Sequence, residues 1–263
     1  MKIRTILLIV LLSGMFVPAK TQSQSAANPA GSAGSGKWTV VMTGTYSSQK
    51  LENLQSLSRR ILLKSNWGIF QGIDFYLTGG LVNLEMKRDT VGITNYKDEK
   101  YRLAAGCGVR INVLSIKKHG FGIWGGAQFL RFKSEGSFVQ PLEAFNKEYN
   151  LTYDWREFEG YAACGVKLSG ITFFGGADAW ALDRRDTKKQ YLVSTSASTY
   201  IGEEKGEYKS GVLIGGVFGV EFGIAGNFKM SIEGHYFSNE NYMILIGIGQ
   251  TGVPSWSRMP DID

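Results

Sequence analysis

Histidine and cysteine, the side chains that most often bind transition metals, are scarce in this sequence. There are two of each among 263 residues, and their positions lack the spacing of a zinc site. No EF-hand pattern for calcium and no phosphate-binding glycine loop occurs either. The sequence therefore predicts no metal ion and no cofactor.

Long apolar runs are missing after the first 20 residues. No later segment has 18 consecutive apolar residues, so no transmembrane helix is predicted there. The nearest candidate, residues 211–226, is interrupted by Glu221 and several glycines. Its apolar positions recur every second residue, which indicates a strand.

Proline is rare as well, with 5 residues against 34 glycines and 13% aromatic residues. Many glycines and aromatics with little proline suit a chain whose strands crowd a narrow interior. The excess of positive charge is also small. Without Lys2 and Arg4 the chain has 27 basic against 23 acidic groups, or +4, too little to indicate a nucleic-acid partner.

The first residues indicate secretion. Lys2 and Arg4 precede an apolar run that ends at the small-residue site Val17-Pro18-Ala19, which is typical of a cleaved signal peptide. We therefore expect a signal peptide at 1–19, a flexible small-residue linker at 20–36, a barrel domain at 37–250 and a C-terminal tail at 251–263.

From residue 37 onward, apolar and polar residues alternate with period two, as at Tyr101–Val113. This pattern predicts an all-β fold, a transmembrane antiparallel up-and-down β-barrel of about ten strands, with eight as the alternative. Short turns alternate with long polar connections near 47–58, 88–99, 134–150 and 184–207. This asymmetry is typical of outer-membrane barrels, and an even strand count places both termini in the periplasm. The predicted strands are 37–46, 59–68, 73–87, 100–113, 120–133, 152–168, 171–183, 208–224, 228–237 and 241–249.

Each strand has one bulky apolar face and one face rich in glycine and charge. We expect the apolar face to contact lipid and the polar face to line the lumen. Because the lumen charges nearly balance and ten strands enclose little space, a plugged or very narrow lumen is predicted. The predicted lumen-lining polar residues are Lys64, Arg102, Arg110, Glu157, Glu159, Lys167, Asp178, Lys209, Glu221, Glu233 and His235.

Several local features accompany this pattern. Aromatic residues near strand ends, among them Trp38 and Trp67 at one rim and Phe129 and Trp155 at the other, are expected to form two girdles. The two cysteines are predicted to be free thiols on the lipid side. At Gly79-Gly80 the polar phase shifts, which suggests a β-bulge or a misplaced strand boundary.

Two segments carry a resemblance to a known family. RRILLKSNWGIFQGIDFYLTGGLVNLEMK (59–87) is similar to the strand–turn–strand unit of small porin-like outer-membrane β-barrel proteins, and KMSIEGHYFSNENYMILIGIG (229–249) resembles their closing hairpin. The resemblance implies an integral protein of the cell outer membrane. Such families end on a strand with a terminal aromatic residue, whereas this chain continues through QTGVPSWSRMPDID.

Three functions are compatible with these features. The first is a non-enzymatic outer-membrane barrel that serves as a structural element, as a narrow channel for small solutes, or to display the connections at 134–150 and 184–207 to an unknown partner. The second is an outer-membrane hydrolase, a protease or lipid A-modifying enzyme, in which His235 acts as general base next to the carboxylate of Glu233. The third is a secreted soluble barrel that binds an apolar ligand. We expect the first, with no catalytic residue.

Overall fold

The computed structural model describes residues 36–51, 54–70, 72–88, 96–98, 100–116, 120–141, 146–194, 197–238 and 241–254. The predicted signal peptide and the linker up to residue 35 lie outside the described residues. In the described part of the chain every regular element is a β-strand, and no helix there is long and apolar enough to cross a membrane.

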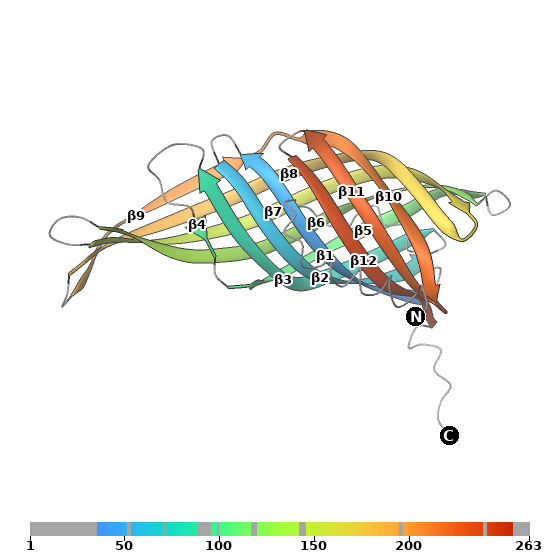
Figure 1. Ribbon diagram of the computed structural model, residues 1–263, viewed down its shortest axis with the longest axis horizontal. Helices are drawn as coiled ribbons and strands as arrows, with labels where there is room; N and C mark the ends of the chain where they lie inside the picture. Colours follow the sequence, from blue (N-terminus) through green and yellow to red (C-terminus); the bar gives the residue numbers. More distant parts are fainter. Residues whose placement is uncertain are drawn as a thin grey trace, which may run out of the picture.

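Within the described ranges, twelve strands form one antiparallel sheet (Figure 1). They are β1 (Lys37–Leu51), β2 (Leu54–Phe70), β3 (Ile73–Arg88), β4 (Tyr96–Lys97), β5 (Arg102–Ile116), β6 (Phe121–Pro141), β7 (Asn146–Leu168), β8 (Ile171–Val193), β9 (Ser198–Lys209), β10 (Leu213–Ala225), β11 (Phe228–Ser238) and β12 (Asn241–Pro254). Strand β12 reaches Pro254, so the first residues of the predicted tail belong to the sheet.

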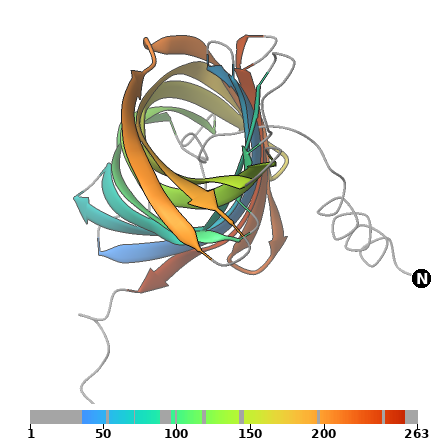
Figure 2. The same ribbon diagram turned by 90° about the vertical axis from the view of Figure 1, so that its left-hand side faces the viewer.

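The sheet closes into a ring, seen along its length in Figure 2. β12 pairs with β1, and β8 pairs with two strands, with β10 along Ile171–Trp180 and with β9 along Asp183–Val193. The two-residue β4 pairs only with β3. Ten strands therefore complete the ring, which confirms the predicted up-and-down β-barrel.

Four short turns lie at the end of the ring where the described chain begins and ends. Each contains a glycine with positive φ, which a side chain would strain: Gly72 (86°), Gly120 (60°), Gly170 (89°) and Gly226 (54°). Lys37 pairs with Pro254 at the same end. We call it the turn end of the barrel.

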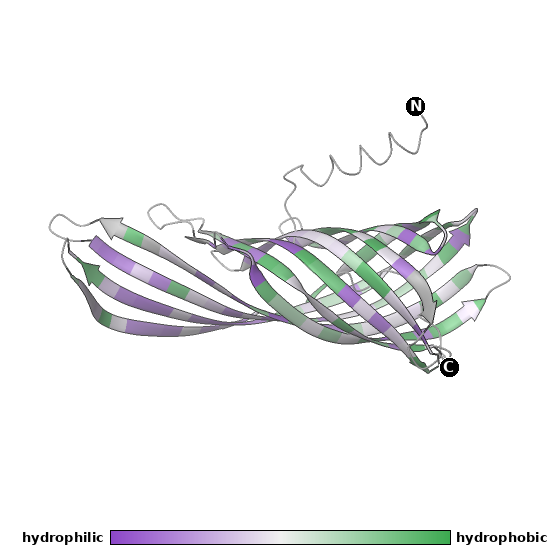
Figure 3. Cartoon of the chain, turned by 90° about the horizontal axis from the view of Figure 1, so that it is seen from below, coloured by the Kyte–Doolittle hydropathy of each residue, from purple (hydrophilic) through white to green (hydrophobic). Residues whose placement is uncertain are grey.

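At the opposite end, strands β6 to β9 continue beyond the ring as an extended sheet (Figure 3), defined as 133–141, 146–154, 183–193 and 198–209. β5 stops pairing with β6 at Ala104↔Phe132, but β6 and β7 remain paired as far as Pro141↔Asn146. Most of 134–150 and 184–207 is therefore strand, and the prediction of long loops there was wrong. The outward face of these strands is mostly polar, so they lack the outward apolar residues whose alternation predicted the strands of the ring.

The outer wall of the ring is apolar. Among the outward-facing residues, Leu103 is 81% exposed, Phe218 is 61% exposed and Ile61 is 52% exposed. An outward aromatic row, Trp38, Trp67 and Phe75, lies near the turn end, with ring centroids 6.3 and 6.5 Å apart. Cys107 and Cys164 are free and exposed on this wall, as the sequence predicted.

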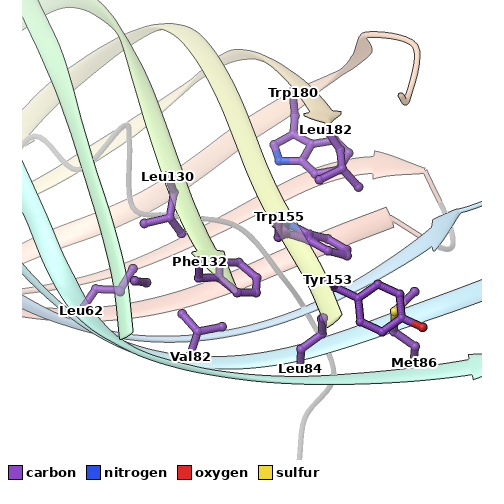
Figure 4. Close-up of a cluster of buried hydrophobic side chains, with 11 residues drawn as sticks. Leu62, Val82, Leu84, Met86, Leu130, Phe132, Tyr153, Trp155, Trp180 and Leu182 are labelled. Carbon is purple, nitrogen blue, oxygen red and sulfur yellow. The ribbon is translucent and has the colours of Figure 1, made fainter. Parts of the chain in front are cut away.

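The lumen holds two apolar clusters. One lies toward the turn end and contains Trp124, Tyr161, Ala163, Phe174 and Val217. The other lies toward the extended sheet (Figure 4) and contains Leu62, Val82, Leu84, Met86, Ala104, Leu130, Phe132, Tyr153, Trp155, Trp180 and Leu182.

The apolar cluster toward the extended sheet explains why two predictions were wrong, the position of Trp155 and the bulge at Gly79-Gly80. Trp155 is 0% exposed and packs inward against Phe132, not in an outer girdle. The β2–β3 register is continuous from Leu54↔Arg88 to Gly68↔Asp74, so no bulge lies at Gly79-Gly80. The polar phase changes there because the inward positions beyond it face apolar side chains rather than charges.

Candidate functional site

Between the two apolar clusters, ionisable and polar side chains from seven strands meet in the lumen. We call this set the polar layer. Its members are Lys64 of β2, Asp74 and Tyr76 of β3, Arg110 of β5, Gln128 of β6, Glu159 of β7, Asp178 of β8, and Glu233 and His235 of β11. Strand alternation points each of them inward.

His235 is at the centre of this layer and is 1% exposed. Its Nδ1 contacts Asp178 Oδ2 and lies 3.7 Å from Glu159 Oε1. Its Nε2 lies 2.5 Å from Glu233 Oε1. One imidazole therefore contacts three carboxylates that come from three strands.

A hydrogen-bonded chain holds Glu159 from the other side. Gln128 Nε2 donates to Glu159 Oε2 at 2.7 Å, and the Tyr76 hydroxyl donates to Gln128 Oε1 at 3.1 Å. Lys64 Nζ lies 3.6 Å from the centroid of the Tyr76 ring. This chain fixes the orientation of the carboxylate that faces His235.

Next to the polar layer, Arg60 of β2 and Glu157 of β7 form a bidentate ion pair, with N···O distances of 2.7 and 2.6 Å. Three strands separate β2 from β7 around the ring, so the pair bridges the lumen. Trp155 Nε1 also donates to Glu157 Oε1 at 2.6 Å. The side chains of Arg60 and Glu157 are 0% and 4% exposed, so solvent hardly reaches the pair.

The remaining predicted lumen residues lie nearer the two ends. At the turn end, Glu221 is buried and pairs with Lys229 at 2.7 Å, and Lys167 is exposed. At the other end, Arg102 donates to Asp98 at 3.0 Å and lies 3.2 Å from Glu135. Seven predicted residues thus lie in the buried middle of the lumen, namely Lys64, Arg110, Glu157, Glu159, Asp178, Glu233 and His235.

Lys209 is the exception. It is exposed at the end of β9 and pairs with Asp183 on the outward face of β8. The sequence placed it in one strand with Glu221, but Ser210–Val212 interrupt that strand and the inward phase restarts at Leu213. The lumen assignment of Lys209 therefore needs correction.

Sequence reasoning missed Arg60, Asp74, Tyr76 and Gln128. Arg60 occupies the same face of β2 as Lys64, two alternate positions earlier, so strand phase could have found it. Leu62 lies between them on that face and is 1% exposed, which hides the pattern.

The extended sheet carries aromatic rings covered by cations on its inward face. Lys147 and Lys188 lie 5.1 and 4.8 Å from the Tyr149 ring, and Arg184 lies 5.5 Å from the Tyr153 ring. Arg184 Nε also donates to Asp186 at 2.7 Å. Burial raises the pKa of Asp186, and the Arg184 guanidinium opposes the rise.

No protein-family model and no curated protein matches the chain. Solved structures with similar folds include the translocator domain of the autotransporter NalP from Neisseria meningitidis, at 10% identity and TM-score 0.44, covering 94% of each chain. They also include the outer membrane protease OmpT from Escherichia coli, at 11% identity and TM-score 0.41, covering 88% of this chain and 100% of that one. A third is the attachment invasion locus protein Ail of Yersinia pestis, at 12% identity and TM-score 0.28, covering 81% of this chain and 95% of that one. All three are outer-membrane β-barrels, the class that the sequence resembles.

Proposed function

We propose that this protein is an integral outer-membrane β-barrel with a closed lumen, and that its role is to present the extended sheet outside the cell to a partner. The observation that carries the closed lumen is the buried Arg60–Glu157 pair, which spans the interior. The apolar clusters on either side of the polar layer add two further barriers to solutes. We infer that neither water-filled conduction nor solute transport is its function.

The membrane location rests on the exposed wall. Large apolar side chains such as Leu103, Val113 and Ile214 are 81%, 71% and 76% exposed, while the charges turn inward. In water this arrangement would expose a large apolar patch, whereas in a bilayer the same side chains contact acyl chains. The secreted soluble barrel requires the reverse arrangement and loses support.

Membrane fractionation and a heat-modifiability gel test the location. We expect the protein in the outer-membrane fraction, as a species that resists SDS until it is heated. Conductance of the purified barrel in a planar bilayer tests the closed lumen, and we expect no channel events. Recovery as a soluble protein would refute the location, and stable single-channel steps would refute the closed lumen.

Orientation has its own test. A Lys205→Cys variant in a background without native cysteines places a thiol in the exposed part of β9. We expect a membrane-impermeant maleimide to label it on intact cells. The matched control, Ser169→Cys in the same background, places the thiol in a turn at the opposite end and should react only after the cells are opened. The reverse labelling pattern would place the extended sheet in the periplasm.

A hydrolase is the second candidate, because carboxylates flank His235 as a general base would require. However, both imidazole nitrogens contact carboxylates and the residue is 1% exposed. A substrate would therefore have to open the barrel to reach it. If an activity on peptides or lipid A were found, unchanged turnover of a His235→Ala variant would eliminate this mechanism.

A further inference from the structure

We propose that Glu159, Asp178 and His235 bind a divalent transition-metal ion inside the closed lumen. One potential ligand atom from each residue lies within 4.8 Å of the others, and all three residues are buried. They come from β7, β8 and β11, and β10 separates β8 from β11 in the ring. The barrel therefore gathers one imidazole and two carboxylates that are far apart in the sequence.

The two nitrogens of His235 are arranged for this role. When Nε2 carries the proton, it donates to Glu233 Oε1 at 2.5 Å. The lone pair of Nδ1 then points toward Asp178 and Glu159. Metal-bound histidines commonly donate their other N–H to a carboxylate, which fixes the tautomer and the orientation of the ring. Glu233 supplies that contact here.

The carboxylate ligands are held in a similar way. Gln128 donates to Glu159 Oε2, so Glu159 directs Oε1 toward the imidazole, 3.7 Å from Nδ1. Two ligands that each lie about 2.1 Å from a tetrahedral ion are about 3.4 Å apart, so this separation needs little adjustment. The shorter contact between Nδ1 and Asp178 Oδ2 has to widen for the ion to fit. Asp178 Oδ1 is buried and accepts no hydrogen bond from the described residues, and a cation would provide its missing partner.

The charges of the polar layer favour a cation as well. Lys64 and Arg110 are its basic groups, and they face Asp74, Glu159, Asp178 and Glu233. With neutral His235 the layer carries a net charge of −2, because Arg60 and Glu157 neutralise each other. Uncompensated buried charge is costly. A divalent ion balances the layer.

The donor set indicates which ions fit. An imidazole nitrogen with carboxylate oxygens suits Zn²⁺, Mn²⁺, Fe²⁺ or Co²⁺, whereas Ca²⁺ and Mg²⁺ prefer oxygen ligands alone. Thiolate is not available, because both cysteines are on the outer wall. Since the lumen is closed, the ion would enter while the barrel folds.

Metal content tests the proposal. The full chain is refolded in detergent with one equivalent of Zn²⁺, desalted and measured by plasma mass spectrometry. We expect about one ion per chain, and at least tenfold less in an Asp178→Asn variant. The matched control, Glu221→Gln, makes the same carboxylate-to-amide change at another buried lumen position and should keep the ion. Wild-type protein without stoichiometric Zn²⁺, or equal binding by Asp178→Asn, would overturn the proposal.

A second measurement does not depend on the folding of a variant. Wild-type protein refolded with Co²⁺ should show the visible absorption of cobalt bound by nitrogen and oxygen ligands in a low-symmetry site. Zn²⁺ present during refolding should abolish that absorption. If refolded protein shows only the spectrum of hydrated cobalt, the site does not exist. Because conductance plays no part in either readout, both results are independent of the proposed function.

Discussion

Breaking the Arg60–Glu157 bridge gives the sharpest test of how this barrel is stabilised. The Arg60→Met substitution keeps an unbranched side chain of moderate length but removes the charge and both hydrogen bonds, at 2.7 and 2.6 Å. Glu157, whose side chain is 4% exposed, then keeps a buried negative charge without its cation.

The expected magnitude follows from that burial. Removing one partner of a buried pair costs about 3–5 kcal/mol, because the other charge is left uncompensated. Trp155 still donates to Glu157 at 2.6 Å, which favours the lower part of this range. We expect the free energy of unfolding to fall by about 3 kcal/mol.

The assay is reversible urea unfolding in lipid vesicles, followed by tryptophan fluorescence. A double variant, Arg60→Met with Glu157→Met, is the matched control, because it removes both charges and should recover most of the loss. A loss below about 1 kcal/mol in the single variant, the size expected of a solvated surface pair, would refute the conclusion that the bridge is dry. It would also weaken the argument for a closed lumen.

Three further predictions concern other parts of the chain. Burial alone would raise the pKa of Asp98, but hydrogen bonds from two backbone amides, a serine and an arginine lower it below 3.8. Its contribution to stability is therefore present above the pKa of the unfolded chain and is lost as the pH falls through the folded value, so hydrogen exchange around β4 should rise below about pH 4. A Cβ at Gly176 would lie 2.0 Å from a backbone oxygen of β7, whereas at Gly175 the nearest atom is 3.5 Å away. Gly176→Ala should thus lower the free energy of unfolding by about 1–3 kcal/mol and with it the urea midpoint, whereas Gly175→Ala should leave both unchanged. Equal midpoints for the two variants would contradict the packing. Cys107 and Cys164 should react with a lipid-soluble maleimide in vesicles and not with a charged one, and labelling by the charged reagent would place the wall in water.

The ring could be predicted from the sequence because its wall meets two different environments. Lipid outside and charges or glycine inside produce alternation that survives along each strand, as at Tyr101–Val113. The same logic identified Glu159, Asp178, Glu233 and His235 as inward residues. The ten predicted strands correspond to the ten strands of the ring.

What could not be predicted depends on contacts across the barrel. Period two gives the direction of a side chain but not its height in the lumen, so Val82 and Leu84 looked out of phase although they face the apolar cluster. Lys209 was misplaced because alternation was extended through the break at Ser210–Val212. The sequence also gave no sign that Glu159, Asp178 and His235 lie together, since spacing along the chain does not reveal three strands that meet in space.

Strand β8 pairs with two strands in succession along its length, with β10 inside the ring and with β9 beyond it. The boundary is marked by Ser210, whose hydroxyl accepts from the Leu182 amide at 2.8 Å. Residue pairs could consequently be deleted in matched numbers from the β6–β7 and β8–β9 hairpins without altering ring closure. The length of the extended sheet and the diameter of the barrel are therefore independent of each other. Evolution or engineering could change the length of the sheet while the membrane-embedded ring stays the same.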